Sequence, residues 1–327
     1  MINTKLHPVI AELLYTKYNE DDSVCSDIAA YRMLFSDFIS AVSYSETKPV
    51  YIQNLEIIPT DIQIPEFNIR IYQRDLPDLR PVLVYFHGGN WVAGDLQTCD
   101  AVCSTIAAES NYVVISVDYA LAPEYCYPIP LYQGVEVVDW INNQGSGYGI
   151  DAKKIVVGGD NAGGNIAAGL IHMLHQKRKI KLFGQLLICP ALYYLFDSPS
   201  FRAFGKGYLL SKEHILESWK TYMGNSNHRF SEFVSPLLAR SVSHVPPTLI
   251  FTAAYDPLQD EAGFYAEHLK REGITVNFNC FEGVTHHFWL MNFILDTAGM
   301  ALNKAIQFLI GLNETADYNL ELRNEHL

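Results

Sequence analysis

The sequence has no apolar run near the roughly 20 residues that a helix needs to cross a bilayer. Its start, Met1 to Lys5, lacks the apolar core of a signal peptide. Basic residues are few, since 23 lysines and arginines stand against 36 aspartates and glutamates, a formal net charge of −13. Nucleic acids and anionic membranes attract basic proteins, so neither is expected as a partner.

Paired cysteine motifs are also missing. The chain of 327 residues has six cysteines, none in C-x-x-C spacing. This pattern indicates reduced thiols in a cytoplasmic protein rather than a disulfide framework. Cys99 and Cys103 are four apart and could share a helix face, but small buried residues are a better interpretation than a metal or redox site. No internal repeat or low-complexity tract is present.

Short apolar runs separated by helical segments dominate the rest of the chain. Residues 51–58 and 67–74 have the pattern of strands, and from residue 80 further apolar runs occur at 81–86, 112–117, 154–158, 184–188, 247–253 and 275–280. Such alternation predicts an α/β fold with a mostly parallel sheet and helices on both faces.

Two segments break this alternation. The N-terminal region has helical spacing at residues 5–18 and 27–45, and residues 193–240 are rich in aromatic side chains. Together they predict a helical lid over the carboxyl ends of the strands, where α/β sheets bind ligands. The expected division is N-terminal helices 1–48, core 49–192, cap insertion 193–240, core 241–312 and a loosely ordered polar tail 313–327.

The most informative motif is Gly159 to Gly164, G-D-N-A-G-G, which follows the apolar run 155–157 and precedes a helical segment. A strand, a sharp turn and a helix around G-x-S-x-G form the nucleophile elbow of hydrolases. Here Asn161 takes the place of the serine. The scaffold therefore predicts a hydrolase whose nucleophilic atom is missing.

A second motif, His87-Gly88-Gly89-Asn90-Trp91, follows the strand expected at 81–86. Glycines allow close backbone approach and expose N–H groups, which form an oxyanion hole with the residue after the nucleophile. The expected donors are Gly88, Gly89, Asn90 and Ala162.

An acid and a base follow the elbow in the order that α/β-hydrolases use. Asp256 and His286 come after the expected strands 247–253 and 275–280. Asp256 is expected to hold the imidazole of His286, which takes up the proton. Asp260 is a competing acid and His287 a competing base. The segment Asp118 to Glu124 is expected to support the oxyanion loop.

Taken together, these motifs resemble the hormone-sensitive-lipase family of α/β-hydrolases in its bacterial esterase branch. The resemblance covers about residues 50 to 310 and includes Ser235-Pro236-Leu237 and Asp256-Pro257-Leu258. It implies an eight-stranded sheet with a helical cap, and hydrolysis of short- to medium-chain acyl esters or lactones. It also implies no metal and no organic cofactor, a small-molecule ester-like substrate and a possible homodimer.

Two positions depart from the family pattern. The third oxyanion-loop glycine is Asn90, whose side chain tolerates unusual φ better than most. The carboxamide of Asn161 cannot form an acyl-enzyme. Three interpretations follow: a silenced esterase, a non-catalytic small-molecule binder, or an acid–base enzyme that uses His286.

The sequence gives less information about the substrate pocket than about the catalytic motifs. Trp91, Asp160, Tyr208 and His287 are its expected lining residues, because they lie beside the motifs or in the aromatic cap segment. Aromatic density near residues 193–208 favours an apolar acyl chain or an aromatic substrate.

Overall fold

The computed structural model describes residues 6–17, 27–44, 50–194 and 197–324, with side chains to residue 315. One sheet of eight strands forms its centre, in the order β1-β2-β4-β3-β5-β6-β7-β8. The bounds are β1 Tyr51–Ile57, β2 Phe67–Gln73, β3 Arg80–Phe86, β4 Val113–Asp118, β5 Ile150–Asp160, β6 Gly184–Ile188, β7 Thr248–Tyr255 and β8 Val276–Thr285.

The sheet is parallel except at one edge. β1 pairs antiparallel with β2, and β2 antiparallel with β4, whereas β4 through β8 run parallel. The central strands are buried along their length, as β3 and β6 show, because helices cover both faces. This confirms the α/β fold predicted from the apolar runs.

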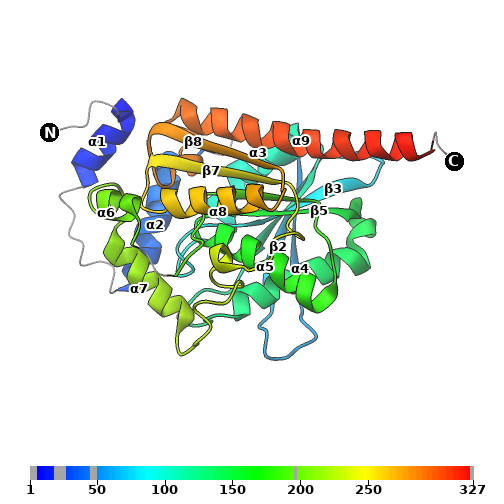
Figure 1. Ribbon diagram of the computed structural model, residues 1–327, viewed down its shortest axis with the longest axis horizontal. Coiled ribbons are helices and arrows are strands. Elements are labelled where there is room, and N and C mark those ends of the chain that lie inside the picture. Colours follow the sequence, from blue (N-terminus) through cyan, green and yellow to red (C-terminus); the bar gives the residue numbers. More distant parts are fainter. Residues whose placement is uncertain (1–5, 18–26, 45–49, 195–196, 325–327) are drawn as a thin grey trace.

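Two layers of helices sandwich the sheet (Figure 1). α3 (Asp100–Glu109) and α9 (Asp296–Asn324) cover one face, whereas α4 (Ile129–Gln144), α5 (Ala162–Arg178) and α8 (Gln259–Arg271) cover the other. Each layer packs into its own hydrophobic core. The remaining short 3-10 helices are η2 Leu96–Cys99, η3 Gly145–Tyr148, η4 Pro236–Leu238 and η5 Phe288–Leu290.

The helices expected outside the alternating core lie together at one side of the sheet (Figure 1). They are α1 (Pro8–Lys17) and α2 (Ile28–Val42) from the N-terminus, and α6 (Pro199–Phe204) and α7 (Lys212–Met223) from the insertion. Tyr31 of α2 contacts His214 of α7 directly, with ring centroids 4.2 Å apart. These four helices are called the cap below. Residues 18–26, between the two N-terminal helices, lie outside the described residues.

The C-terminal segment differs from expectation. A loosely ordered tail was predicted from residue 313, but α9 continues as a helix to Asn324 (Figure 1). No proline occurs in this stretch and its last glycine is Gly311, so nothing interrupts the helix once it is established. Within the described residues, no helix combines the length and the apolar character needed to span a membrane.

Candidate active site

The elbow at Asn161 is a strained turn between β5 and α5. Asn161 has φ 52° and ψ −114°, a conformation that side-chain-bearing residues rarely adopt. Glycine is required on both sides, because a Cβ on Gly159 or Gly163 would lie 2.2 Å or 1.9 Å from the carbonyl oxygen of Phe86. The Asn161 N–H donates to the carbonyl of Ile188 across 2.9 Å. The backbone thus presents residue 161 where a nucleophile elbow presents its serine.

The predicted acid and base meet at this turn. Nδ1 of His286 lies 2.7 Å from Oδ2 of Asp256, and both side chains are buried. The other oxygen of Asp256 accepts from the N–H of Leu258 at 2.9 Å, which fixes the carboxylate. Nε2 of His286 lies 3.0 Å from Nδ2 of Asn161. The three residues therefore form one continuous chain of hydrogen bonds.

The competing acid and base have other contacts. Asp260 accepts from the N–H of Ser200 at 2.8 Å and so anchors the start of α6. The ring of His287 packs against Phe35 and Phe38 of the cap helix α2. The hydrogen-bond chain therefore runs through Asp256 and His286.

The donor groups in this series of hydrogen bonds determine where its protons lie. The N–H of Asn90 donates to the Asn161 side chain at 2.9 Å, so the atom that faces it must be the carbonyl oxygen. Nδ2 of Asn161 then donates to His286, and Nε2 of His286 must be the acceptor. The ring proton lies on Nδ1, facing Asp256, which is the tautomer of a general base.

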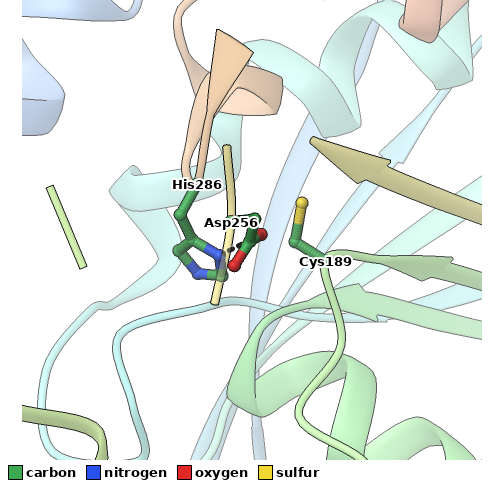
Figure 2. A group of neighbouring side chains, drawn as sticks. All are labelled: Cys189, Asp256 and His286. Atoms are coloured by element: carbon green, nitrogen blue, oxygen red, sulfur yellow. Dashed lines mark hydrogen bonds and ion pairs between the residues drawn. The ribbon is translucent and has the colours of Figure 1, made fainter. Parts of the chain in front are cut away.

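A buried cysteine that the sequence did not single out lies on the other side of the acid. Figure 2 shows Asp256 between the ring of His286 and the side chain of Cys189, and one donor atom from each lies within 4.8 Å of the other two. Within the described part of the chain, this is the single such group. Burial raises the pKa of the Cys189 thiol, and the carboxylate of Asp256 raises it further. A protonated thiol suits a hydrogen-bond donor rather than a metal ligand.

The oxyanion loop follows β3 and lies beside the elbow. Gly89, Asn90 and Trp91 all have positive φ, at 110°, 54° and 61°. Gly89 needs this freedom, because its Cβ would lie 2.1 Å from the carbonyl oxygen of Ala93. The Asn90 N–H points at residue 161. Asparagine is thus accommodated at the position where the family has glycine.

Gly88 and Asp160 must be reassigned. The Gly88 N–H donates to Oδ1 of Asp160 at 3.1 Å, and the Tyr85 hydroxyl donates to the same oxygen at 2.8 Å. Asp160 is only 4% exposed, and burial raises the pKa of its carboxyl to about 6. The Gly88 N–H is therefore committed to a carboxylate rather than to an oxyanion. Asp160 ties β3 to β5 and does not line a pocket.

One other pocket prediction also changes. Trp91 is 1% exposed and stacks on Tyr222, with centroids 4.7 Å apart and planes 8° apart, so it belongs to the core beneath the cap. Tyr208 is half-buried and stacks on Tyr255 at 5.6 Å, and its place in the pocket stays a prediction. His287 contacts the His286 ring at 4.4 Å and is the member of the set that lies beside the hydrogen-bond chain.

The segment expected to support the oxyanion loop contacts it at two points. Tyr119 donates to the carbonyl of His87 at 2.8 Å and stacks on the His87 ring. The N–H of Ala122 donates to the carbonyl of Trp91 at 2.9 Å. Arg32 of α2 pairs with both carboxylate oxygens of Glu124, which lowers the pKa of that carboxyl.

The fold and this geometry define an α/β-hydrolase. A family model for the α/β-hydrolase fold matches residues 83–290. The chain is 33% identical over 238 residues to an arylesterase of Saccharolobus solfataricus, covering 72% of this chain and 76% of that protein. It is 30% identical over 282 residues to an ethyl acetate hydrolase of Pseudomonas putida, covering 85% and 88%. The chain therefore belongs to the hormone-sensitive-lipase-like family of α/β-hydrolases.

Solved structures agree with this assignment. An ester hydrolase from the metagenome of Lake Arreo, complexed with a bipyridine phosphonate derivative, superposes with a TM-score of 0.87 at 29% identity, covering 94% of this chain and 98% of that one. A hyperthermophilic esterase of Pyrobaculum calidifontis superposes with a TM-score of 0.86 at 27% identity, covering 95% and 99%. The scaffold is that of a carboxylic-ester hydrolase.

Proposed function

We propose that this chain carries a carboxylesterase site for small acyl esters or lactones that Asn161 silences. The observation that carries the proposal is the position of the Asn161 carboxamide. Its oxygen accepts from the Asn90 N–H and its nitrogen donates to Nε2 of His286. The Asn161 side chain thus occupies a hydrogen-bond donor of the oxyanion hole and also the base His286. It offers no nucleophile of its own.

A serine at position 161 would restore each missing step. Its hydroxyl would attack the ester carbonyl while Nε2 of His286 takes the proton, and Asp256 would stabilise the resulting imidazolium. The oxyanion would be held by the N–H of Asn90, freed from the carboxamide, together with those of Gly89 and Ala162. Loss of the alcohol gives an acyl-enzyme, which water then hydrolyses.

The test is Asn161→Ser, with Asn161→Ala as the matched control. Both substitutions remove the carboxamide, but only serine supplies a nucleophile. Loss of a triad nucleophile leaves about 10³–10⁴-fold catalysis over water out of a far larger total. We expect Asn161→Ser to cleave p-nitrophenyl acetate or butyrate at least about 10³-fold faster than Asn161→Ala. Equal rates in two folded variants would refute the proposal.

A second candidate function is a small-molecule binder that keeps the site without turnover. The Asp256–His286 hydrogen bond is intact although residue 161 is not a nucleophile. This favours a binding function over a protein whose site no longer has any role. It predicts thermal stabilisation of the natural protein by an ester without any product. An acid–base reaction through His286 would instead yield product from the natural protein, which chromatography of the ligand after incubation would detect.

A homodimer belongs to the same proposal, on the family resemblance alone. Light scattering coupled to size-exclusion chromatography separates a monomer of 36.9 kDa from a particle of twice that mass.

A further inference from the structure

Two cap helices bring polar side chains together next to the oxyanion loop. Tyr31 of α2 and His214 of α7 meet edge to face, with centroids 4.2 Å apart and planes at 87°. Nδ2 of Asn90, in the oxyanion loop, donates to the Tyr31 hydroxyl at 3.3 Å. Asparagine at position 90 therefore links the cap to the loop, which glycine could not do.

These contacts form a continuous series that reaches the histidine at the elbow. Asn90 donates through its backbone to Asn161, and Asn161 donates to His286. The contacts run from His286 through Asn161, Asn90 and Tyr31 to His214.

The imidazole of His214 is available for hydrogen bonding. Its backbone N–H donates to Oγ of Ser211 at 3.2 Å, and no hydrogen bond of its ring nitrogens is found among the described residues. The residue is partly buried rather than fully enclosed. Burial, together with His286, lowers the pKa of the ring to about 4. A neutral imidazole offers one donor and one acceptor, which matches the two roles of a hydroxyl group.

The charged side chains near Tyr31 and His214 indicate that this region does not bind an anionic ligand. Arg32, next to Tyr31 on α2, is held by Glu124 and by the carbonyl of Val92 at 2.7 Å. It is therefore not available to bind a carboxylate. A carboxylate placed near Asp256, the acid of the site, would also be disfavoured.

We propose that Asn90, Tyr31 and His214 form a polar subsite that binds a neutral hydroxyl or carbonyl substituent near the scissile bond. The substrate class is then hydroxy- or oxo-substituted esters, rather than the plain alkyl or aromatic esters that the aromatic cap sequence favoured. The kinetic test of this proposal rests on the proposed esterase function, because it measures turnover by the Asn161→Ser variant.

The kinetic test uses the Asn161→Ser background and a matched pair of esters, p-nitrophenyl butyrate and p-nitrophenyl 3-hydroxybutyrate. A site built around a hydroxyl discriminates against the analogue that lacks it. We expect kcat/KM to favour the hydroxy ester by about 10-fold or more. His214→Phe, which keeps a ring but removes both nitrogens, is expected to abolish that ratio. His228→Phe, at an exposed histidine outside the subsite, is the control and keeps it.

Tyr31→Phe removes a single hydroxyl and is expected to lower the same ratio, which covers the case in which His214→Phe does not fold. An unchanged ratio in folded His214→Phe or Tyr31→Phe would overturn the subsite. So would a preference of Asn161→Ser for butyrate or for the charged monosuccinate ester.

A binding test separates this proposal from the catalytic one. If Asn161→Ser proves inactive, the esterase proposal fails but the subsite still predicts binding. Ethyl 3-hydroxybutyrate is expected to raise the melting temperature of Asn161→Ala more than ethyl butyrate does, and His214→Phe is expected to remove the difference. Equal shifts from the two esters would refute the subsite independently of turnover.

Discussion

The amide of Asn161 holds the base of its own site, because Nδ2 donates to Nε2 of His286 across 3.0 Å. Its oxygen holds the Asn90 N–H at the same time. Asn161 thus stabilises the arrangement that it prevents from reacting.

Stability should therefore fall when the carboxamide is removed. Asn161→Ala leaves the buried Asn90 N–H without its partner and keeps the strained backbone of the elbow, so we expect a loss of about 1–3 kcal/mol. Asn161→Gly loses the same hydrogen bonds but tolerates positive φ, so it should be more stable than Asn161→Ala by about 1 kcal/mol. Urea unfolding of the three proteins measures both differences. An alanine variant as stable as the natural protein would show that the two hydrogen bonds contribute nothing.

The elbow glycine should be irreplaceable. A Cβ on Gly163 would lie 1.9 Å from the carbonyl oxygen of Phe86, so Gly163→Ala must displace β3 or α5 and should cost about 3 kcal/mol or more. The control is Gly311→Ala in α9, where no atom lies within 4 Å and alanine should stabilise the helix by about 0.5–1 kcal/mol. Thermal unfolding gives both values, and similar melting temperatures for the two variants would contradict this account.

Trp91 should act through the core rather than through substrate contact. Its ring is stacked on Tyr222 and contacts Trp219, with centroids 4.1 Å apart. Trp91→Ala should cost about 3–5 kcal/mol of unfolding free energy. Phe264→Ala, at a side chain that is 57% exposed, should change it by less than about 0.5 kcal/mol. A well-folded Trp91→Ala with native stability would return Trp91 to the pocket.

The stability contribution of Asp160 should depend on pH. Burial raises the pKa of its carboxyl from 3.8 to about 6 in the folded protein, so the native state holds a proton that the unfolded chain has already lost. This contribution is complete below about pH 4 and is lost as pH rises through 6, by about 3 kcal/mol in total at 1.36 kcal/mol per pKa unit.

The measurement compares the natural protein with Asp160→Asn in urea at pH 4, 5, 6 and 7. The stability of the natural protein relative to the variant should decrease from pH 4 to 6 and level off above 7. Groups common to both proteins, such as His87, cancel in this difference. Parallel curves would mean that Asp160 stays ionised over the whole range.

Much of the fold could be predicted because apolar runs mark buried parallel strands directly. The run at residues 184–188 coincides with β6, and the others lie within a few residues of their strands. The order of elbow, acid and base likewise indicated Asp256 and His286. The C-terminal helix was missed because a polar, acidic composition indicates solvent exposure but not backbone conformation.

The details of the site depended on contacts between distant segments. Nothing near Gly88 in the sequence indicates that its N–H donates to Asp160, or that Trp91 stacks on a side chain 131 positions later. Cys189, Tyr31 and His214 carried no motif at all. Cys189 is positioned by the end of β6, and Tyr31 and His214 by the packing of the cap helices. The periodicity of apolar residues in the sequence does not predict these features.

The hydrogen bonds of Arg32 connect the cap helix α2 to the oxyanion loop. From α2, this side chain binds the carbonyls of Val92 and Ala122 and the carboxylate of Glu124, at distances of 2.6–3.1 Å. A ligand that displaced α2 would therefore strain the strand-to-loop junction that carries Asn90. The position of α2 and the alignment of the oxyanion loop are thus coupled through the Arg32 guanidinium.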